Sequence, residues 1–183
     1  MESYTDKVVV ITGGATGIGF SFAKRFGDEG AKIVIAGRRQ AKLDEAVGAL
    51  GALDIDATAF ACDVGEYDAV EALAYFAWNT YGRADVIMNN AGVSQIPSTV
   101  IDASSEEVER MLRINFLGLW NGVSVFGKRF IEQGTPAAIY NVGSENSLYN
   151  FAPRAFAYEA SRHGVHALSD ALREEVPDFI EVC

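Results

Sequence analysis

Residues 8–19 read VVVITGGATGIG, and the helix-like stretch Phe20 to Phe26 follows them directly. This order predicts a buried strand, a glycine turn and a helix within one short span. A backbone that turns this sharply, and also lets a phosphate group approach the N-terminus of the helix, needs residues without a Cβ atom at the turn and at the contact point. Gly13, Gly17 and Gly19 stand at those points. The stretch therefore favours a phosphate-binding turn over the alternative, an ordinary glycine-rich turn.

The composition limits the classes of protein to which such a turn could belong. The chain has 183 residues, 49% of them apolar, which is enough for one domain with a substantial core. A formal net charge of −10 argues against a nucleic-acid partner, because phosphate backbones are bound by clustered lysine and arginine. We expect no signal peptide and no membrane partner, because the polar start Met1 to Lys7 is short and no run approaches about 18 apolar residues. Cys62 and Cys183 are too few for a disulfide framework or a metal cluster, so a cytoplasmic location is expected.

Apolar runs of strand length alternate with stretches of helix length along the chain. The runs are nearly continuous in valine, isoleucine and alanine, which is typical of parallel strands covered by helices on both faces. We therefore predict an α/β fold, a Rossmann-like doubly wound parallel sheet, as a single domain over residues 1–183. The expected strands are Lys7 to Ile11, Lys32 to Ala36, Ala57 to Ala61, Asp85 to Asn89 and Ala137 to Val142. The expected helices after the first are Gln40 to Leu50, Tyr67 to Tyr81, Ser104 to Gln133 and Ala155 to Glu175.

The long predicted helix carries apolar side chains around most of its circumference. Ser104 and Glu107 form a capping-box pattern that marks its start. Phe116, Trp120 and Phe126 are among the apolar residues that spread around the helix, so two of its sides must be covered. We expect a homo-oligomer, a dimer or tetramer, in which a partner subunit covers the second side. A neighbour within the same chain is the alternative.

The end of the second predicted strand bears on the choice of dinucleotide. In dinucleotide-binding folds this position reaches the adenosine ribose, and an acidic residue there usually binds the 2′-hydroxyl group of NAD. The sequence has Gly37, Arg38 and Arg39 instead. An arginine fork matches a 2′-phosphate, so NADP(H) is preferred and NAD(H) is the alternative. The alternative is that Arg38 and Arg39 are ordinary solvent-exposed residues of a loop and do not contact the cofactor.

Several segments resemble motifs of the short-chain dehydrogenase/reductase family, and they follow the family's order from about Lys7 to the C-terminus. The spacing of the glycines is similar to that of the family's compact oxidoreductases rather than its extended nucleotide-sugar epimerases. The segments are the Thr12 to Gly19 turn, Asp63-Val64, Asn89-Asn90-Ala91-Gly92, Asn115, Asn141-Val142-Gly143-Ser144, and Tyr158 to Arg162, which resembles the family's Tyr-x-x-x-Lys motif.

The resemblance implies an NAD(P)-dependent oxidoreductase that acts on CH–OH groups. It implies that Ser144, Tyr158, Arg162 and Asn115 are catalytic, with Asn115 holding the helix backbone and a water that carries the proton onward. It also implies that Asp63-Val64 lies on the adenine side. The residues expected to bind the cofactor are Gly13, Thr16, Gly17, Ile18, Gly19, Gly37, Arg38, Arg39, Asp63, Val64, Asn90, Ala91, Gly92, Tyr158 and Arg162.

The catalytic chemistry also follows from the residue types. Reduction of a carbonyl by hydride needs a proton donor, and a tyrosine can serve because a cation within about 4 to 6 Å lowers its ordinary pKa of about 10. Tyr158 and Arg162 are four residues apart and share one face of a helix. Ser144 would hydrogen-bond the substrate oxygen. Ser147 in the same loop is an alternative serine, and Glu145 could face the substrate instead.

His163 and His166 lie one helical turn apart, but no third ligand is close in sequence. Helix-face positions explain them better than a metal site, so we predict no metal.

Two departures from the family pattern bear on activity. Arg162 stands where the family has lysine; arginine cannot give up a proton in a relay, so we expect slowed catalysis with cofactor binding retained. The sequence ends at Cys183, where the family's sixth strand is just beginning. We therefore expect the last strands to be missing, the fifth strand to present an unpaired apolar edge, and the chain to be a fragment.

The sequence is compatible with two classes of function. The first is an NADP-dependent oxidoreductase that acts on a hydroxyl or carbonyl group of a small molecule. The second is a cofactor-binding protein with weak or no catalysis, such as a sensor or an assembly partner.

Overall fold

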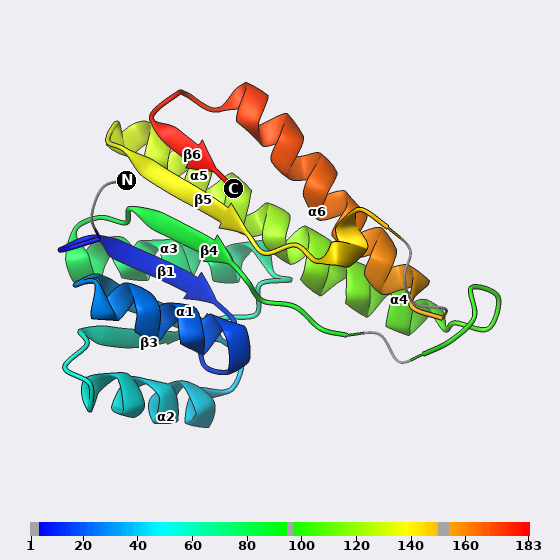
Figure 1. Cartoon of the computed structure of the whole chain (residues 1–183), viewed down its shortest axis with the longest axis horizontal. Coiled ribbons are helices and arrows are strands. Elements are labelled where there is room, and N and C mark those ends of the chain that lie inside the picture. Colours follow the sequence, from blue (N-terminus) through cyan, green and yellow to red (C-terminus); the bar gives the residue numbers. More distant parts are fainter. Residues whose placement is uncertain (1–3, 95–96, 150–153) are drawn as a thin grey trace.

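The computed structural model describes residues 4–94, 97–149 and 154–183, and its centre is one parallel sheet of six strands (Figure 1). The strand order is β3-β2-β1-β4-β5-β6, and every neighbouring pair is parallel. This confirms the predicted α/β, Rossmann-like class. The strands are β1 (Val8–Thr12), β2 (Lys32–Gly37), β3 (Ala57–Ala61), β4 (Val86–Asn89), β5 (Ala137–Asn141) and β6 (Ile180–Val182).

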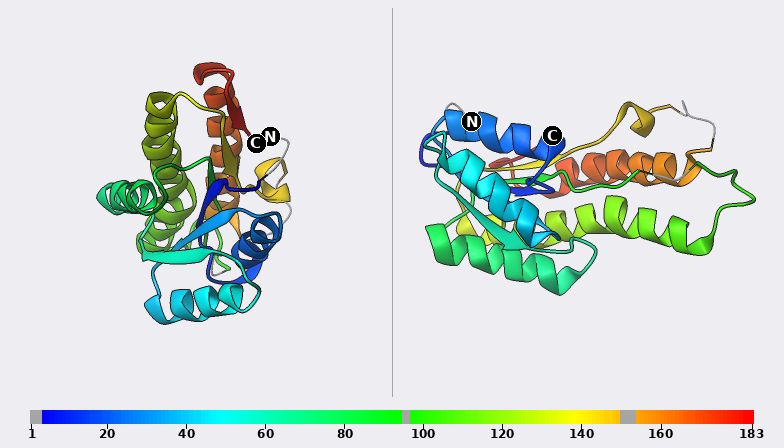
Figure 2. Two further views of the ribbon diagram at one scale, coloured as in Figure 1. Left: turned by 90° about the vertical axis from the view of Figure 1, so that its left-hand side faces the viewer. Right: turned by 90° about the horizontal axis from the view of Figure 1, so that it is seen from below.

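Helices cover both faces of this sheet, as the continuous apolar runs predicted (Figure 2). Helices α1 and α2 pack on one face, and α3, α5 and α6 pack on the other. The bounds are α1 (Gly17–Asp28), α2 (Gln40–Gly51), α3 (Tyr67–Tyr81), α4 (Ser105–Leu112), a π-helical turn η1 (Arg113–Leu117), α5 (Gly118–Gln133), a 3-10 turn η2 (Glu145–Ser147) and α6 (Phe156–Glu175).

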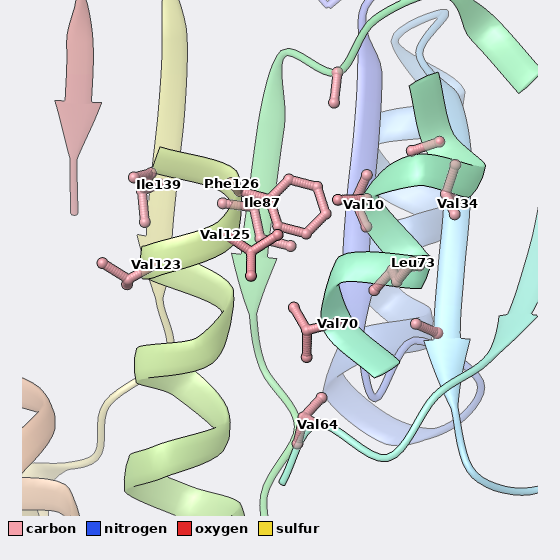
Figure 3. Packing of buried hydrophobic residues seen from close by; sticks show 14 of the residues in the cluster. Val10, Val34, Val64, Val70, Leu73, Ile87, Val123, Val125, Phe126 and Ile139 are labelled. Carbon is pink, nitrogen blue, oxygen red and sulfur yellow. The ribbon is translucent and has the colours of Figure 1, made fainter. Parts of the chain in front are cut away.

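Strand β1 shows why the runs have no polar alternation. Successive side chains of a strand point to opposite faces of its sheet. Val8 and Val10 enter the core beside α3, α5 and α6, whereas Val9 and Ile11 enter the core beside α1 and α2. Both faces are dry, so each of these positions is apolar. Figure 3 shows the first of these cores, where residues of α3 and α5 meet those of the central strands.

The long helix predicted from Ser104 to Gln133 is interrupted. Its predicted start is confirmed, because the Ser104 hydroxyl accepts a hydrogen bond from the Glu107 N–H at 3.2 Å. The π turn η1 then separates α4 from α5. Such a wide turn keeps the apolar pattern running, so the periodicity of the sequence does not reveal it.

The prediction that β5 presents an unpaired edge is wrong. Strand β6 is present and pairs with β5 in parallel, so that Ala137, Ala138 and Ile139 lie opposite residues 180–182. Ile180 is buried in the same core as α6, and this burial holds the short strand in place. Within the described residues, no helix is both long and apolar enough to cross a membrane.

A substitution at Phe126 tests the account of this core. The Phe126 ring is fully buried and lies 5.9 Å from Trp78 and 6.1 Å from Phe130, centroid to centroid. Phe126→Ala should lower the free energy of unfolding by about 3 to 5 kcal/mol, because it leaves a cavity in addition to removing apolar contacts. The measurement is urea unfolding followed by circular dichroism. Tyr75→Ala on α3, where the ring is 61% exposed, is the control and should stay within about 0.5 kcal/mol of the wild type. Equal losses in the two variants would contradict this account.

Candidate active site

The glycine turn between β1 and α1 has the backbone that the sequence predicted. Gly13 and Gly17 have φ angles of +66° and +56°, a region that residues with a Cβ atom rarely adopt. A Cβ atom on Gly19 would overlap the Gly13 carbonyl oxygen. Within the described residues, the N-cap residue of α1, Thr16, makes no side-chain capping bond, which suits the first N–H groups of the helix to an outside acceptor.

Hydrogen bonds fasten this turn to the segment after β4. The Thr12 hydroxyl accepts bonds from the N–H groups of Asn90 at 3.0 Å and Ala91 at 3.1 Å. The Asn90 amide donates back to the carbonyl oxygens of Thr12 at 2.9 Å and Gly13 at 3.3 Å. The two loops therefore form one unit at the point where the strand order reverses between β1 and β4.

A cleft of about 510 Å³ opens along these loops. Of the residues predicted to bind a cofactor, all but Gly17, Tyr158 and Arg162 line it within the described part of the chain. The lining also includes residues that the sequence reasoning missed, namely Ala15, Ala36, Lys42, Leu43, Cys62, Val93 and Ile114.

One end of the cleft is cationic. Arg38 and Arg39 are exposed there, and neither has an ion-pair partner among the described residues. Lys42 joins them from the first turn of α2, with its Nζ 2.6 Å from Glu45 Oε2. It is the third residue of α2, whose N-cap is Arg39, and its backbone N–H donates to the Arg39 carbonyl oxygen at 3.0 Å, so the helix predicted to begin at Gln40 could have revealed it. Gly37 leaves this end open, since a Cβ atom there would meet only Leu43, at 3.8 Å.

The predicted pair Tyr158 and Arg162 does share one face of α6. The guanidinium carbon of Arg162 lies 5.2 Å from the centroid of the Tyr158 ring. Arg162 is 6% exposed, and its Nη1 donates to the Val142 carbonyl oxygen at 3.0 Å. Its buried Nε has no hydrogen-bond partner among the described residues. The guanidinium also contacts Gly92, where a Cβ atom would overlap it, so the pair lies beside the Gly92 end of the cleft.

The loop after β5 carries Ser144 and its neighbours. The Ser144 N–H donates to the Ser147 hydroxyl at 3.0 Å, and the Ser147 N–H donates to the Ser144 carbonyl at 2.8 Å. Ser147 is buried, and its hydroxyl holds the loop by accepting the bond from the Ser144 N–H. Glu145 is exposed at the start of η2, and η2 packs against α6, the helix of Tyr158.

Asn115 occupies the middle of the π turn and is fully buried. Its Oδ1 accepts from the Val93 N–H at 2.8 Å, and its Nδ2 donates to the Val93 carbonyl at 2.9 Å and the Ser161 hydroxyl at 3.2 Å. Ser161 in turn donates to the Tyr158 carbonyl oxygen at 2.6 Å. Asn115 therefore joins the cleft wall at Val93 to the helix of Tyr158.

The two histidines make contacts within α6. His163 Nδ1 lies 2.9 Å from the Glu159 carbonyl oxygen, and His166 Nε2 lies 3.5 Å from Asp170 Oδ2. Both side chains are on the exposed side of the helix, as the helix-face interpretation expected.

A model of the short-chain dehydrogenase family matches residues 7–183. The chain belongs to this family. It is 34% identical to the probable oxidoreductase EphD of Mycobacterium tuberculosis over 175 residues, 94% of this chain and 29% of that one. It is 33% identical to short-chain dehydrogenase reductase 3a of Arabidopsis thaliana, over 88% of this chain and 62% of that protein.

Solved structures of the family share the architecture. A short-chain dehydrogenase/reductase from Burkholderia phymatum in complex with NAD matches with a TM-score of 0.95 at 29% identity, over 99% of this chain and 65% of that one. Actinorhodin polyketide ketoreductase with NADPH matches with a TM-score of 0.92 at 28% identity, over 100% of this chain and 70% of that one. The chain thus spans 29% and 62% of the lengths of the two curated relatives named above.

The thiol in the cleft wall provides a test of the site's environment. Burial, together with the negative charge of Asp63, raises the pKa of Cys62 from 9.0 to about 12. The thiol therefore stays protonated at pH 8 and is a poor nucleophile. We expect a disulfide reagent at pH 8 to modify the exposed Cys183 first, and to modify Cys62 only after unfolding in guanidinium. The Cys183→Ser variant should show no fast phase, and a fast phase in that variant would contradict the assigned burial.

Proposed function

We propose that this chain forms the cofactor-binding and catalytic part of an NADP-dependent oxidoreductase acting on a hydroxyl or carbonyl group of a small molecule. The observation that carries the proposal is the Tyr158–Arg162 pair stacked beside the Gly92 end of a glycine-rich cleft. When bound, NADP(H) supplies or accepts the hydride.

The residues of the cleft fit a dinucleotide. The close approach of Gly19 to Gly13 leaves no space for a Cβ atom, and the uncapped start of α1 suits a pyrophosphate. The buried Nε of Arg162 is a donor without an acceptor among the described residues, and a ribose hydroxyl group at this end would provide one. These features support the predicted roles of the glycine turn, of Asn90 to Gly92, and of Arg162 in holding the cofactor.

The cationic end of the cleft supports NADP over NAD. Arg38 and Arg39 lack ion-pair partners in the described structure, and Gly37 leaves room beside them. A guanidinium fork binds a phosphate in a bidentate manner, which a ribose hydroxyl cannot match. The relatives of known structure named above bind NAD in one case and NADPH in the other, so the preference rests on these residues of the chain itself.

Each of the proposed catalytic residues would have a separate role in moving the proton or in holding the substrate. Tyr158 Oη donates its proton to the oxygen of the substrate during reduction and accepts one during oxidation. Arg162, whose guanidinium carbon lies 5.2 Å from the centroid of the Tyr158 ring, holds that ring at the Gly92 end of the cleft. Ser144 donates a hydrogen bond that holds the substrate oxygen near Tyr158. Asn115 keeps the two sides of the site together through Val93 and Ser161.

The arginine also supports a second candidate, a cofactor-binding protein with weak catalysis. Arg162 Nη1 is already bonded to the Val142 carbonyl, and a guanidinium does not release protons at neutral pH. A chain of this kind would bind NADPH but turn over slowly.

We also propose a homo-oligomer. Leu112, Leu117 and Trp120 on the α4–α5 segment keep 37%, 45% and 43% of their surface exposed, and a second copy would cover them. A cytoplasmic location is proposed with it, supported by the two free cysteines.

Replacement of Arg162 distinguishes the two candidates. Arg162→Lys should raise the turnover of NADPH with generic carbonyl substrates by at least about tenfold, because lysine can pass a proton onward. Tyr158→Phe should lower turnover by a factor of about 10² or more, because it removes the proton donor. The assay is NADPH oxidation at 340 nm, with NADPH binding followed separately by fluorescence.

The matched control is Arg173→Lys, the same substitution on α6 at an exposed arginine that bonds Asp170. It should leave turnover unchanged. Turnover in Arg162→Lys that is equal to or lower than that of the wild type would contradict the role given to Arg162. A wild type that binds NADPH without turnover, unaffected by Tyr158→Phe, would select the second candidate.

A further inference from the structure

Arg113, the first residue of the π turn, reaches across to the wall of the cleft. Its Nη1 donates to Glu66 Oε1 at 2.7 Å, and its Nη2 donates to Asp63 Oδ2 at 3.3 Å. Asp63 lines the cleft, whereas Glu66 is outside the lining within the described residues. The guanidinium thus connects a helix to a wall residue that lies 50 positions earlier in the chain.

Both oxygens of Asp63 are held by the protein. Oδ1 accepts a hydrogen bond from the Gly65 N–H at 3.0 Å, and Oδ2 faces Arg113. Each carboxylate oxygen can accept a second bond, and 28% of the Asp63 side chain remains exposed. The carboxylate is therefore fixed in direction and still has acceptor capacity.

The approach of Arg113 depends on a small residue. A Cβ atom on Gly65 would lie 2.6 Å from Arg113 Nη1, so the guanidinium lies directly on the backbone of this turn. The same wall is held again from α5, where the buried Asn121 donates to the Val64 carbonyl at 2.7 Å. A Cβ atom on Gly118 would lie 2.6 Å from the Val64 side chain. Helix α5 therefore packs closely against the segment from Asp63 to Gly65 that forms this wall of the cleft.

We infer that Arg113 is a positioning residue for recognition of the adenine ring, holding Asp63 so that it accepts a hydrogen bond from the 6-amino group. This inference rests on the proposed function and on the family resemblance, which implies that Asp63 lies on the adenine side of NADP(H). Arg113 also supplies a positive charge between Asp63 and Glu66, two carboxylates that would otherwise repel an anionic cofactor. A guanidinium is suited to both tasks, because its planar fork fixes two acceptors at once.

The exocyclic group of the purine provides the test. Adenine has a donor at position 6, whereas hypoxanthine has an oxygen acceptor there, which a fixed carboxylate would reject. Fluorescence titrations with NADPH and with its hypoxanthine analogue should show that the wild type prefers adenine by about tenfold. In Arg113→Ala the preference should fall to about twofold or less. A merely structural loosening would weaken both ligands together and leave their ratio unchanged.

Three further variants define the role. Arg113→Lys keeps the charge without the planar fork, so it should give an intermediate preference. Glu66→Gln should keep the preference, because Asp63 retains its contact with Arg113. Arg25→Ala is the matched control: Arg25 forms an exposed ion pair with Glu29 at 2.6 Å, outside the cleft lining, and its loss should change neither affinity. Asp63→Asn should abolish the preference for adenine over hypoxanthine. This variant replaces Arg113→Ala as the test if Arg113→Ala does not fold.

The outcomes separate this inference from the proposed function. A wild type that binds neither ligand overturns the proposed function and this inference with it. A wild type that binds both ligands equally, or a folded Arg113→Ala variant that keeps the full preference, overturns this inference alone.

Discussion

The hydrogen bonds of Thr12 are the constraint on which the rest of the site depends. Its hydroxyl accepts from the N–H groups of Asn90 and Ala91, and Asn90 donates back to the glycine turn. Strands β1 and β4 are neighbours in the sheet, but the chain leaves them toward opposite faces, so a crevice opens between their ends. The bonds of Thr12 fix the width of that crevice at its base. The cleft is built on this unit.

The π turn holds two parts of the wall of the same cleft. Arg113, at its start, holds the Asp63 wall, and Asn115, two residues later, holds Val93 and the helix of Tyr158. A regular helix turns by about 100° per residue, and one extra residue in a turn changes which side chains point toward the sheet and which toward α6. The π turn between α4 and α5 therefore sets the angle between the side chains of Arg113 and Asn115. A continuous α-helix would set a different angle.

The sequence predicted the parts of this structure that depend on local pattern. The glycine turn, the strands and the face shared by Tyr158 and Arg162 follow from residue type and period, and the structure confirms these placements. The π turn escaped prediction because its apolar pattern is that of a helix. The pairing of Arg113 with Asp63 joins residues far apart in sequence, so no local signal marks it. The prediction of an unpaired edge at β5 was wrong. Residues 180–182 are enough to form a strand that pairs with β5, because Ile180 is buried in the core.

Titration of the purified chain with NADPH and with NADH tests the central claim most directly. Fluorescence would give both affinities, and the thermal shift at saturation would check that binding stabilises the fold. NADPH should bind at least about tenfold more tightly than NADH and should raise the unfolding temperature, since the proposed role of Arg38 and Arg39 is to bind the 2′-phosphate. Equal affinities, or tighter binding of NADH, would contradict the role of these arginines. Binding of neither would contradict the nucleotide site itself.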